Sequence, residues 1–342
     1  MERHITLIST GGTIASRWQG TGYAADASGG DVLAGAAVPD GVVVDVVDLF
    51  NVNSSRLTSA QQLELLRAVG AALADPRVDG VVVTHGTDTL EESAFLLDLH
   101  HDDPRPVVFT GAQRPLGAVD GDGPGNVYDA LQVAATVRDL GVLVVFDGLV
   151  HAARGTVKTQ TVASHPFTDP SGDGALGRLG FGRVDLRARP ERSAPLPLPA
   201  VRGPLPRVDV VMHHCDADPL FVETAVAAGA RGLVLVATGA GNATPLMVDA
   251  IAAAVRAGVL VAVTTRVPAG PVSPIYTGGG AVDLVAAGAV LTGTLRAGQA
   301  RIAVLAALLA DVPHEERAEL LRRLVLGTAS GAAAPARVGV PA

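Results

Sequence analysis

Residues 81–92 read Val-Val-Val-Thr-His-Gly-Thr-Asp-Thr-Leu-Glu-Glu, and the residue pattern changes twice within them. The β-branched run at the start predicts a buried strand. After a polar run, apolar residues at positions 90, 94, 95 and 97 recur at helical spacing, with two acids in the first turn. A buried strand that passes at once into a helix is typical of an α/β fold with a mostly parallel sheet.

Thr87 and Asp88 stand where this strand would pass into the helix. In open α/β sheets, ligands bind at the carboxyl ends of the strands, so both residues are candidates for chemistry. An ordinary helix N-cap is the alternative, because threonine and aspartate both cap helices well. One cap residue would satisfy that need, whereas five polar or glycine residues, 85–89, follow the strand in a row, which favours a functional site.

The same alternation of strand and helix continues on both sides of this stretch. The predicted strands are 5–9, 42–49, the one that begins at 81, 107–110 and 142–146, with helices at 60–74 and 128–140. A proline-rich segment interrupts the pattern, which then resumes with strands at 208–212, 233–237, 260–264 and 290. We therefore expect a larger N-terminal mostly parallel α/β domain at 1–188, a linker at 189–206, a smaller C-terminal parallel α/β domain at 207–327 and a disordered tail at 328–342.

The composition narrows the class of protein. A chain of 342 residues can bury a substantial core, and its net charge of -8 without a basic cluster argues against a nucleic-acid partner. Although 48% of the residues are apolar, no run is long enough to span a bilayer. The chain enters a strand directly, without a signal-peptide pattern, and Cys215 is its single cysteine. These features predict a cytoplasmic protein without a disulfide.

Lys158 is the only lysine among the 26 basic residues, and all the others are arginine. A partly buried lysine can give up its proton, whereas an arginine effectively cannot. Chance placement is the alternative, but the polar run Gly155-Thr156-Val157-Lys158-Thr159 follows another predicted strand. We therefore expect a functional role for this lysine.

Several predicted strands end in tracts that carry hydroxyl groups. If the sheet is parallel, these tracts converge on one crevice, which would hold two threonines, an aspartate, a lysine and serines. A threonine hydroxyl needs a base or a neighbouring charge to become a nucleophile, and Lys158 beside Asp88 could move its proton through Thr87. Glycines at 11, 12 and 86 would let backbone N–H groups reach an oxyanion. This set of groups suits acyl transfer from an amide.

Two segments, 10–15 (Thr-Gly-Gly-Thr-Ile-Ala) and 84–92, carry a resemblance to the bacterial-type L-asparaginase (asparaginase/glutaminase) family. Further matches follow in family order along most of the chain at 111–115, 122–124, 157–159, 241–242 and 266–270. The resemblance implies an amidohydrolase that converts L-asparagine to L-aspartate and ammonia without a cofactor or metal. It also implies a homodimer or homotetramer with each site at a subunit interface.

The resemblance further assigns roles to individual residues. Thr13 would be the primary nucleophile, Tyr23 on a flap would assist it, and Thr87, Asp88 and Lys158 would form a second catalytic group. The substrate's α-carboxylate and α-amino groups would be held by Ser54 and Asp88, with Ser55 beside them. Asn242 would reach such a site from the C-terminal domain.

Some positions depart from the family pattern. Members often carry glutamine where Ser55 stands and aspartate where Arg56 stands. Some members use a glutamate from a neighbouring subunit to bind the α-amino group, whereas residues 271–280 contain no acid here and Tyr276 could occupy that space. Weaker substrate binding or altered selectivity is therefore a hypothesis.

Other interpretations of these motifs are less favoured. Gly11-Gly12-Thr13 could be a phosphate loop, but it lacks the glycine and lysine spacing of such loops. The contiguous run at 213–216, His-His-Cys-Asp, suits the loop at the end of a strand better than a zinc site. The alternatives in function are a glutaminase-asparaginase or related amidase, and a non-catalytic amino-acid-binding homologue that keeps the fold.

Overall fold

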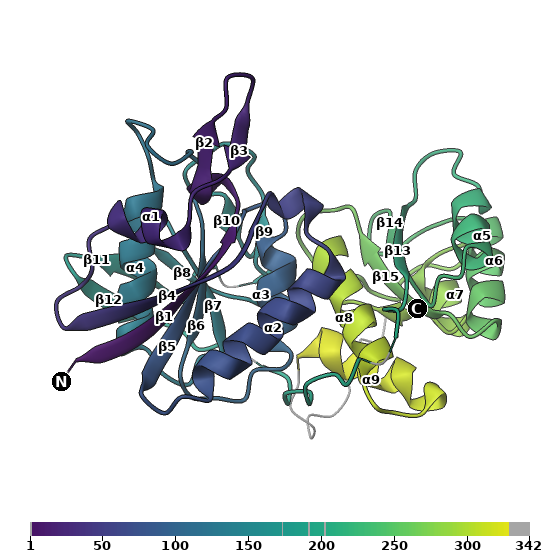
Figure 1. Ribbon diagram of the computed structural model, residues 1–342. Coiled ribbons are helices and arrows are strands. Elements are labelled where there is room, and N and C mark those ends of the chain that lie inside the picture. The colour runs from purple at the N-terminus through teal and green to yellow at the C-terminus, as the bar shows by residue number, and fades with distance from the viewer. Residues whose placement is uncertain (1, 173, 191, 202, 328–342) are drawn as a thin grey trace.

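The computed structural model describes residues 2–172, 174–190, 192–201 and 203–327, which form two α/β domains (Figure 1). The larger domain contains an eight-stranded sheet in the order β12-β11-β8-β7-β6-β5-β1-β4. Strands β4, β1, β5, β6 and β7 are parallel, and β8, β11 and β12 add an antiparallel edge. The strands are β1 Arg3–Gly11, β4 Val42–Val52, β5 Val78–Thr84, β6 Val107–Thr110, β7 Val142–Phe146, β8 Leu149–Ala152, β11 Gly177–Gly180 and β12 Arg183–Leu186.

Helices cover both faces of this sheet, because alternate strand residues point to opposite sides. Val81 and Val83 belong to the core on the face covered by α2 and α3, whereas Val82 belongs to the core under α1 and α4. All three valines are fully buried. The helices are α1 Gly29–Ala34, α2 Ser59–Leu73, α3 Leu90–Asp98 and α4 Gly123–Thr136.

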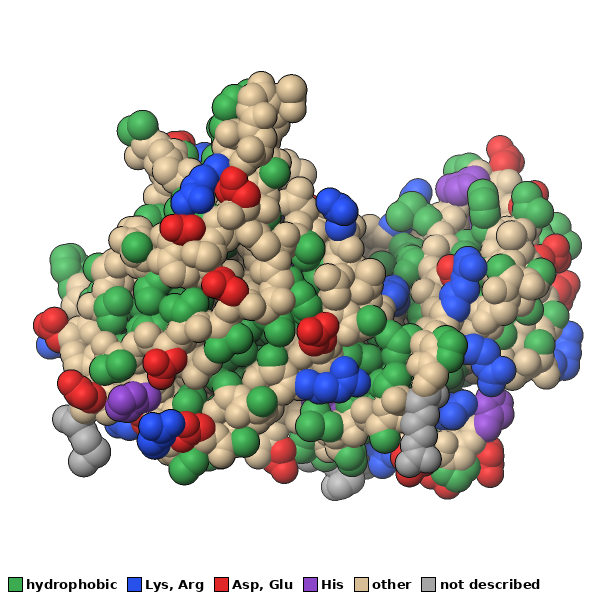
Figure 2. All heavy atoms as spheres, viewed as in Figure 1, with side chains coloured by type: hydrophobic (Ala, Val, Ile, Leu, Met, Phe, Trp, Pro, Cys, Tyr) green, Lys and Arg blue, Asp and Glu red, His purple; other side chains and the backbone are tan. Residues whose placement is uncertain are grey.

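Two small pairs of strands lie outside this sheet. A hairpin of β2 Ser16–Trp18 and β3 Tyr23–Ala25 projects from the domain, as Figures 1 and 2 show. The second pair joins β9 Val157–Lys158 to β10 Phe167–Thr168 in antiparallel register. Lys158 therefore does not belong to the main sheet.

The smaller domain contains a parallel sheet in the order β13-β14-β15-β16. Its α8 packs on this sheet and also contacts α3, so the buried core continues from one domain to the other. The elements are β13 Val208–Met212, α5 Leu220–Ala227, β14 Gly232–Ala237, α6 Pro245–Arg256, β15 Leu260–Thr265, α7 Ala281–Ala286, β16 Val290–Leu291, α8 Ala297–Leu309 and α9 Arg317–Leu326. The expected fold class is confirmed: a larger, mostly parallel N-terminal α/β domain and a smaller parallel C-terminal one.

The helix predicted at 128–140 is displaced toward the N-terminus. The observed α4 begins at Gly123, because Pro124 fits the first turn of a helix, where its missing N–H is not needed. It ends at Thr136, since Val137 is extended and Asp139 has a positive φ of 62°. The sequence pattern had suggested neither limit.

The segment 189–206 contains no helix or strand at its described positions. Arg192 Nε lies 3.0 Å from Asp98 Oδ1, and the Leu196 backbone N–H donates to Leu99 O at 2.8 Å. These contacts attach the segment to the end of α3, and they support our proposal that it joins the two domains. The tail predicted to be disordered, 328–342, lies outside the described residues.

The sequence contains no basic cluster, and it favours a strand-end loop over a zinc site at 213–216. On the face that Figure 2 shows, basic and acidic side chains are scattered. The run at 213–216 follows β13 and ends in a turn, so the interpretation as a strand-end loop is confirmed. Within the described ranges, no group of three or more His, Cys, Asp or Glu side chains could hold a metal ion.

No helix of the described chain is both long and apolar enough to cross a membrane.

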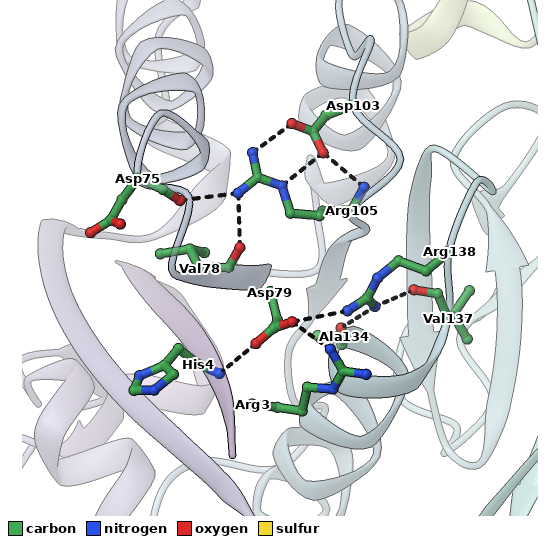
Figure 3. Close-up of polar contacts among 10 residues, drawn as sticks. All are labelled: Arg3, His4, Asp75, Val78, Asp79, Asp103, Arg105, Ala134, Val137 and Arg138. Atoms are coloured by element: carbon green, nitrogen blue, oxygen red, sulfur yellow. Dashed lines mark hydrogen bonds and ion pairs between the residues drawn. The ribbon is translucent and has the colours of Figure 1, made fainter. Parts of the chain in front are cut away.

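At the amino ends of the strands, two charged side chains tie separate elements together (Figure 3). Arg105 donates to the backbone carbonyls of Leu73 at the end of α2, of Asp75 in the turn that follows, and of Val78 at the start of β5. It also pairs with Asp103 at 2.7 Å. Nearby, the Asp79 carboxylate accepts from the His4 N–H at 3.0 Å and pairs with two arginines, Arg3 and Arg138. These contacts lie at the edge of the sheet opposite to the strand ends that carry the polar tracts.

Replacement of Arg105 by methionine is expected to lower the free energy of unfolding by about 3 kcal/mol, because several carbonyl groups would lose a charged donor. Urea unfolding measures the change. Arg77→Met is the matched control: Arg77 pairs with Asp75 in the same region, but its side chain is 83% exposed, so little change is expected. Equal losses in the two variants would contradict the role of Arg105.

Candidate active site

A cavity of about 380 Å³ opens at the carboxyl ends of β4, β1, β5 and β6, which are neighbours in the sheet. Parallel strands present their carboxyl ends at one edge, so loops that are distant in sequence meet there. The lining residues are Gly12, Thr13, Ser16, Tyr23, Asn53, Ser54, Ser55, Gly86, Thr87, Asp88, Gln113 and Pro115.

The loops after β1 and β5 are locked together in close contact. Thr10 Oγ1 donates to Thr84 O at 2.9 Å, which joins the two strands just before the loops begin. Gly12 has a φ of 85°, and a Cβ at this position would lie 2.3 Å from Gly86 Cα. Only glycine fits such an approach, so the glycines bring Thr13 and Thr87 to the same cavity.

Lys158 meets Thr87 and Asp88 at the edge of this cavity. Its Nζ lies 2.8 Å from Thr87 Oγ1 and 2.8 Å from Asp88 Oδ1, and the lysine side chain is only 18% exposed. Thr87 Oγ1 in turn donates to Gln113 Oε1 at 3.3 Å. The arrangement links an ammonium group, a hydroxyl group and a carboxylate, which can hold or move a proton at the threonine oxygen.

The structure does not support the interpretation of Thr87 and Asp88 as helix caps. The N-cap position of α3 is Thr89, and its hydroxyl donates instead to Ser54 O at 2.9 Å. Ser54 is buried, and its Oγ accepts from the Asp88 backbone N–H at 3.2 Å. The cap of α2 is Thr58, which forms a capping box with Gln61, so Ser54 has no capping role there.

Thr13 and Tyr23 reach the cavity from the segment after β1. Thr13 begins a short 3₁₀ helix, η1 Thr13–Ala15, directly after Gly12. Tyr23 comes from the projecting hairpin, where its ring meets Trp18 edge to face at 5.2 Å between centroids. The Tyr23 side chain is exposed outside its contact with the cavity.

Ser55 and Asn242, which the resemblance places near the substrate, differ in their position relative to the cavity. Ser55 lines the cavity but is exposed. Asn242 does not line it, because it follows β14 in the other domain. The Asn242 Oδ1 is buried and has no hydrogen-bond partner within the described chain. An unpaired buried oxygen of this kind can accept from a group that the single chain does not supply.

Sequence reasoning missed two polar side chains at the site. Gln113 was visible only as part of a matched motif, and Glu91 only as an acid in the first turn of a helix. Glu91 Oε2 accepts from the Lys158 backbone N–H at 2.5 Å. Loss of hydration on burial raises the pKa of Glu91 to about 7, and the neighbouring Glu92 adds to this effect. The contact of Gln113 with Thr87 and that of Glu91 with the Lys158 N–H leave no signal in the local sequence pattern.

His85 lies fully buried beneath the loop that carries Thr87. Its Nδ1 is 2.8 Å from Gly86 O, its Nε2 has no partner within the described residues, and its ring packs on Phe109. Burial lowers the pKa of His85 to about 4, so the ring stays neutral at pH 7. The His85 ring therefore packs beneath the loop in its neutral form.

This histidine is expected to make the protein sensitive to acid. The unfolded chain binds a proton below pH 6.5, whereas the folded chain excludes it until about pH 4. Stability is thus lost as the pH falls through this window, and the His85 contribution is about 2 kcal/mol between pH 7 and pH 5. Urea unfolding of wild type and His85→Leu at both pH values tests this. The variant should lose less stability than wild type, and an equal loss would refute the assignment.

The fold and the site together define a two-domain α/β protein in which hydroxyl, ammonium and carboxylate groups meet at the strand ends. Residues 4–192 match the family model described as "Asparaginase, N-terminal", and residues 207–321 match "Glutaminase/Asparaginase C-terminal domain". The chain belongs to the asparaginase family.

Individual relatives agree with this assignment. The chain is 36% identical to the L-asparaginase of Bacillus licheniformis over 316 residues, which covers 91% of this chain and 97% of that protein. It is 33% identical to a probable periplasmic L-asparaginase of Haemophilus influenzae, covering 89% and 88%. The crystal structure of a probable cytoplasmic L-asparaginase from Campylobacter jejuni superposes with a TM-score of 0.83 at 28% identity, covering 94% of this chain and 99% of that one.

Proposed function

We propose that this protein hydrolyses L-asparagine to L-aspartate and ammonia. The contact of Lys158 with Thr87 and Asp88, at the edge of a cavity that Thr13 also lines, carries the proposal. The site holds the hydroxyl and amine groups that acyl transfer from an amide requires. The similarity to named L-asparaginases over most of the chain supports this substrate class.

In the proposed reaction, the Thr13 hydroxyl attacks the side-chain amide carbon of asparagine. The C–N bond breaks, ammonia leaves with the proton taken from the hydroxyl, and an ester to Thr13 remains. Water then attacks the ester, which releases aspartate and returns the proton to Thr13. The Thr87, Asp88 and Lys158 group moves the proton in these steps, and backbone N–H groups near Gly12 and Gly86 stabilise the oxyanion, where one donor can contribute about 3 kcal/mol.

The remaining assignments follow the same proposal. Ser54 and Asp88 hold the α-carboxylate and α-amino groups, Ser55 lies beside them, and Tyr23 assists Thr13. Asn242 acts at the site of a neighbouring copy, in a homodimer or homotetramer, which is consistent with its unpaired Oδ1. We place the protein in the cytoplasm, as the name of the Campylobacter jejuni structure suggests for that protein.

A glutaminase-asparaginase is the second candidate, because the model matched by the C-terminal domain is described for both activities. The lack of an acid in residues 271–280 favours weak binding of the α-amino group. We expect aspartate formation from asparagine, a KM at least about tenfold higher than is typical of tight-binding amidohydrolases, and slower glutamate formation from glutamine. Initial rates with both substrates measure this. A micromolar KM would contradict weak binding, and faster turnover of glutamine would favour the second candidate.

A further inference from the structure

The backbone around Lys158 receives little support from regular structure. Lys158 lies on β9, a strand of two residues that pairs only with β10 and lies outside the eight-stranded sheet. The ammonium group nevertheless keeps two contacts of 2.8 Å. Positions of this kind need other anchors, because a catalytic group must be held to within about 0.5 Å of its working geometry.

One anchor comes from the other domain. Gln299, in the first turn of α8, is 0% exposed although its side chain is polar. Its Oε1 accepts from the Gly155 N–H at 2.9 Å, and its Nε2 donates to Ala153 O at 2.8 Å and to Thr156 O at 3.0 Å. One acceptor faces an N–H and one donor group faces two carbonyls, so the amide fits in a single orientation.

A second anchor holds the same loop two residues further on. Glu91 Oε2 accepts from the Lys158 N–H, while Glu91 Oε1 lies so close to α8 that a Cβ on Gly298 would be 3.1 Å from it. The first turns of α3 and α8 therefore lie against each other, and both hold the segment 153–158. Gln299 holds three backbone groups of this segment, and Glu91 holds one more.

We propose that Gln299 is a positioning residue, through which α8 of the C-terminal domain holds the Lys158 ammonium group against Thr87 and Asp88. The effect on turnover rests on the proposed function, whereas the effect on the position of Lys158 does not. Under this proposal the C-terminal domain takes part in the site of the same chain, by fixing the loop that carries the amine. Gln299 itself touches neither the cavity nor the ammonium group.

The uniqueness of Lys158 gives a direct measurement. It is the only lysine of the chain, so trinitrobenzenesulfonate can modify one ε-amine, which peptide mass spectrometry separates from the N-terminus.

Gln299→Met keeps the side-chain length and removes all three hydrogen bonds. We expect Lys158 to be modified at least about fivefold faster in this variant, because the loop opens more often. We expect kcat to fall about 10- to 100-fold, while KM changes less than about threefold.

Arg301→Met is the matched control on the same helix. Arg301 also reaches the N-terminal domain, where it donates to Ser59 Oγ at 2.9 Å and lies 3.6 Å from Glu92, but it does not contact the loop. Its loss should leave both the modification rate and kcat within about twofold of wild type. If Gln299→Met does not fold, Gln299→Glu, which keeps the acceptor, is tested in its place. A folded Gln299 variant with the wild-type modification rate, or equal effects of the Arg301 variant, would overturn the proposal.

This experiment can refute the proposed function or the positioning role of Gln299 without refuting the other. Modification of Lys158 needs no substrate, so a wild-type protein that forms no aspartate would refute the proposed function and leave the comparison of modification rates valid. Conversely, an active wild type with unchanged modification in Gln299→Met would refute only the positioning role.

Discussion

Replacement of Lys158 by arginine is expected to lower kcat for asparagine at least about a thousandfold, although the positive charge is kept. The lysine ammonium lies 2.8 Å from both Thr87 Oγ1 and Asp88 Oδ1 in a mostly buried position. A guanidinium group is planar and larger than an ammonium group, and it cannot release its proton at neutral pH. Charge alone should therefore not restore the function of this residue.

Aspartate formation in Lys158→Arg and Lys158→Ala measures the effect, and circular dichroism checks that both variants fold. Added ethylamine should raise the rate of Lys158→Ala, because a free amine can enter the space left by the side chain. It should not raise the rate of Lys158→Arg, where that space is filled. A Lys158→Arg variant that keeps a tenth of the wild-type kcat would show that the proton of Lys158 is not needed.

Replacement of Thr13 by alanine is expected to lower kcat at least about 10⁴-fold, because the hydroxyl that forms the proposed ester is absent. Thr13→Ser keeps a hydroxyl in the same position and should retain part of the activity. Thr13 begins a 3₁₀ helix behind a glycine fixed by its neighbours, so loss of its methyl group should disturb the loop little. Aspartate formation at saturating asparagine is the measurement.

The matched comparison is Thr87→Ala, because Thr87 lines the same cavity and carries the hydrogen bond from Lys158. Acid quenching during turnover, followed by peptide mass spectrometry, should find the aspartyl ester on the peptide that contains Thr13. An ester on the peptide that contains Thr87, together with an active Thr13→Ala, would reverse the two roles.

Local sequence patterns predicted much of the fold. The strands at 107–110, 142–146 and 208–212 begin and end where the β-branched runs do. The runs at 107–110 and 142–146 are buried on both faces, which leaves a continuous apolar signal in the sequence. The helix at 123–136 was displaced because its first turn carries Gly123 and Pro124, which an apolar period does not reveal. Patterning therefore located the ends of these strands better than the ends of this helix.

The sequence by itself determined the fold class and the polar tracts that follow the strands, because both depend on the order of residues along a single strand and helix. Which side chains touch was decided only by the tertiary structure. Gln113 beside Thr87, Glu91 on the Lys158 N–H and Gln299 on the loop before Lys158 join elements as far as 146 residues apart. Such contacts are fixed by how the sheet and the two domains pack. A buried polar side chain looks the same in a linear sequence whether it meets a solvent molecule, a backbone group or a catalytic amine.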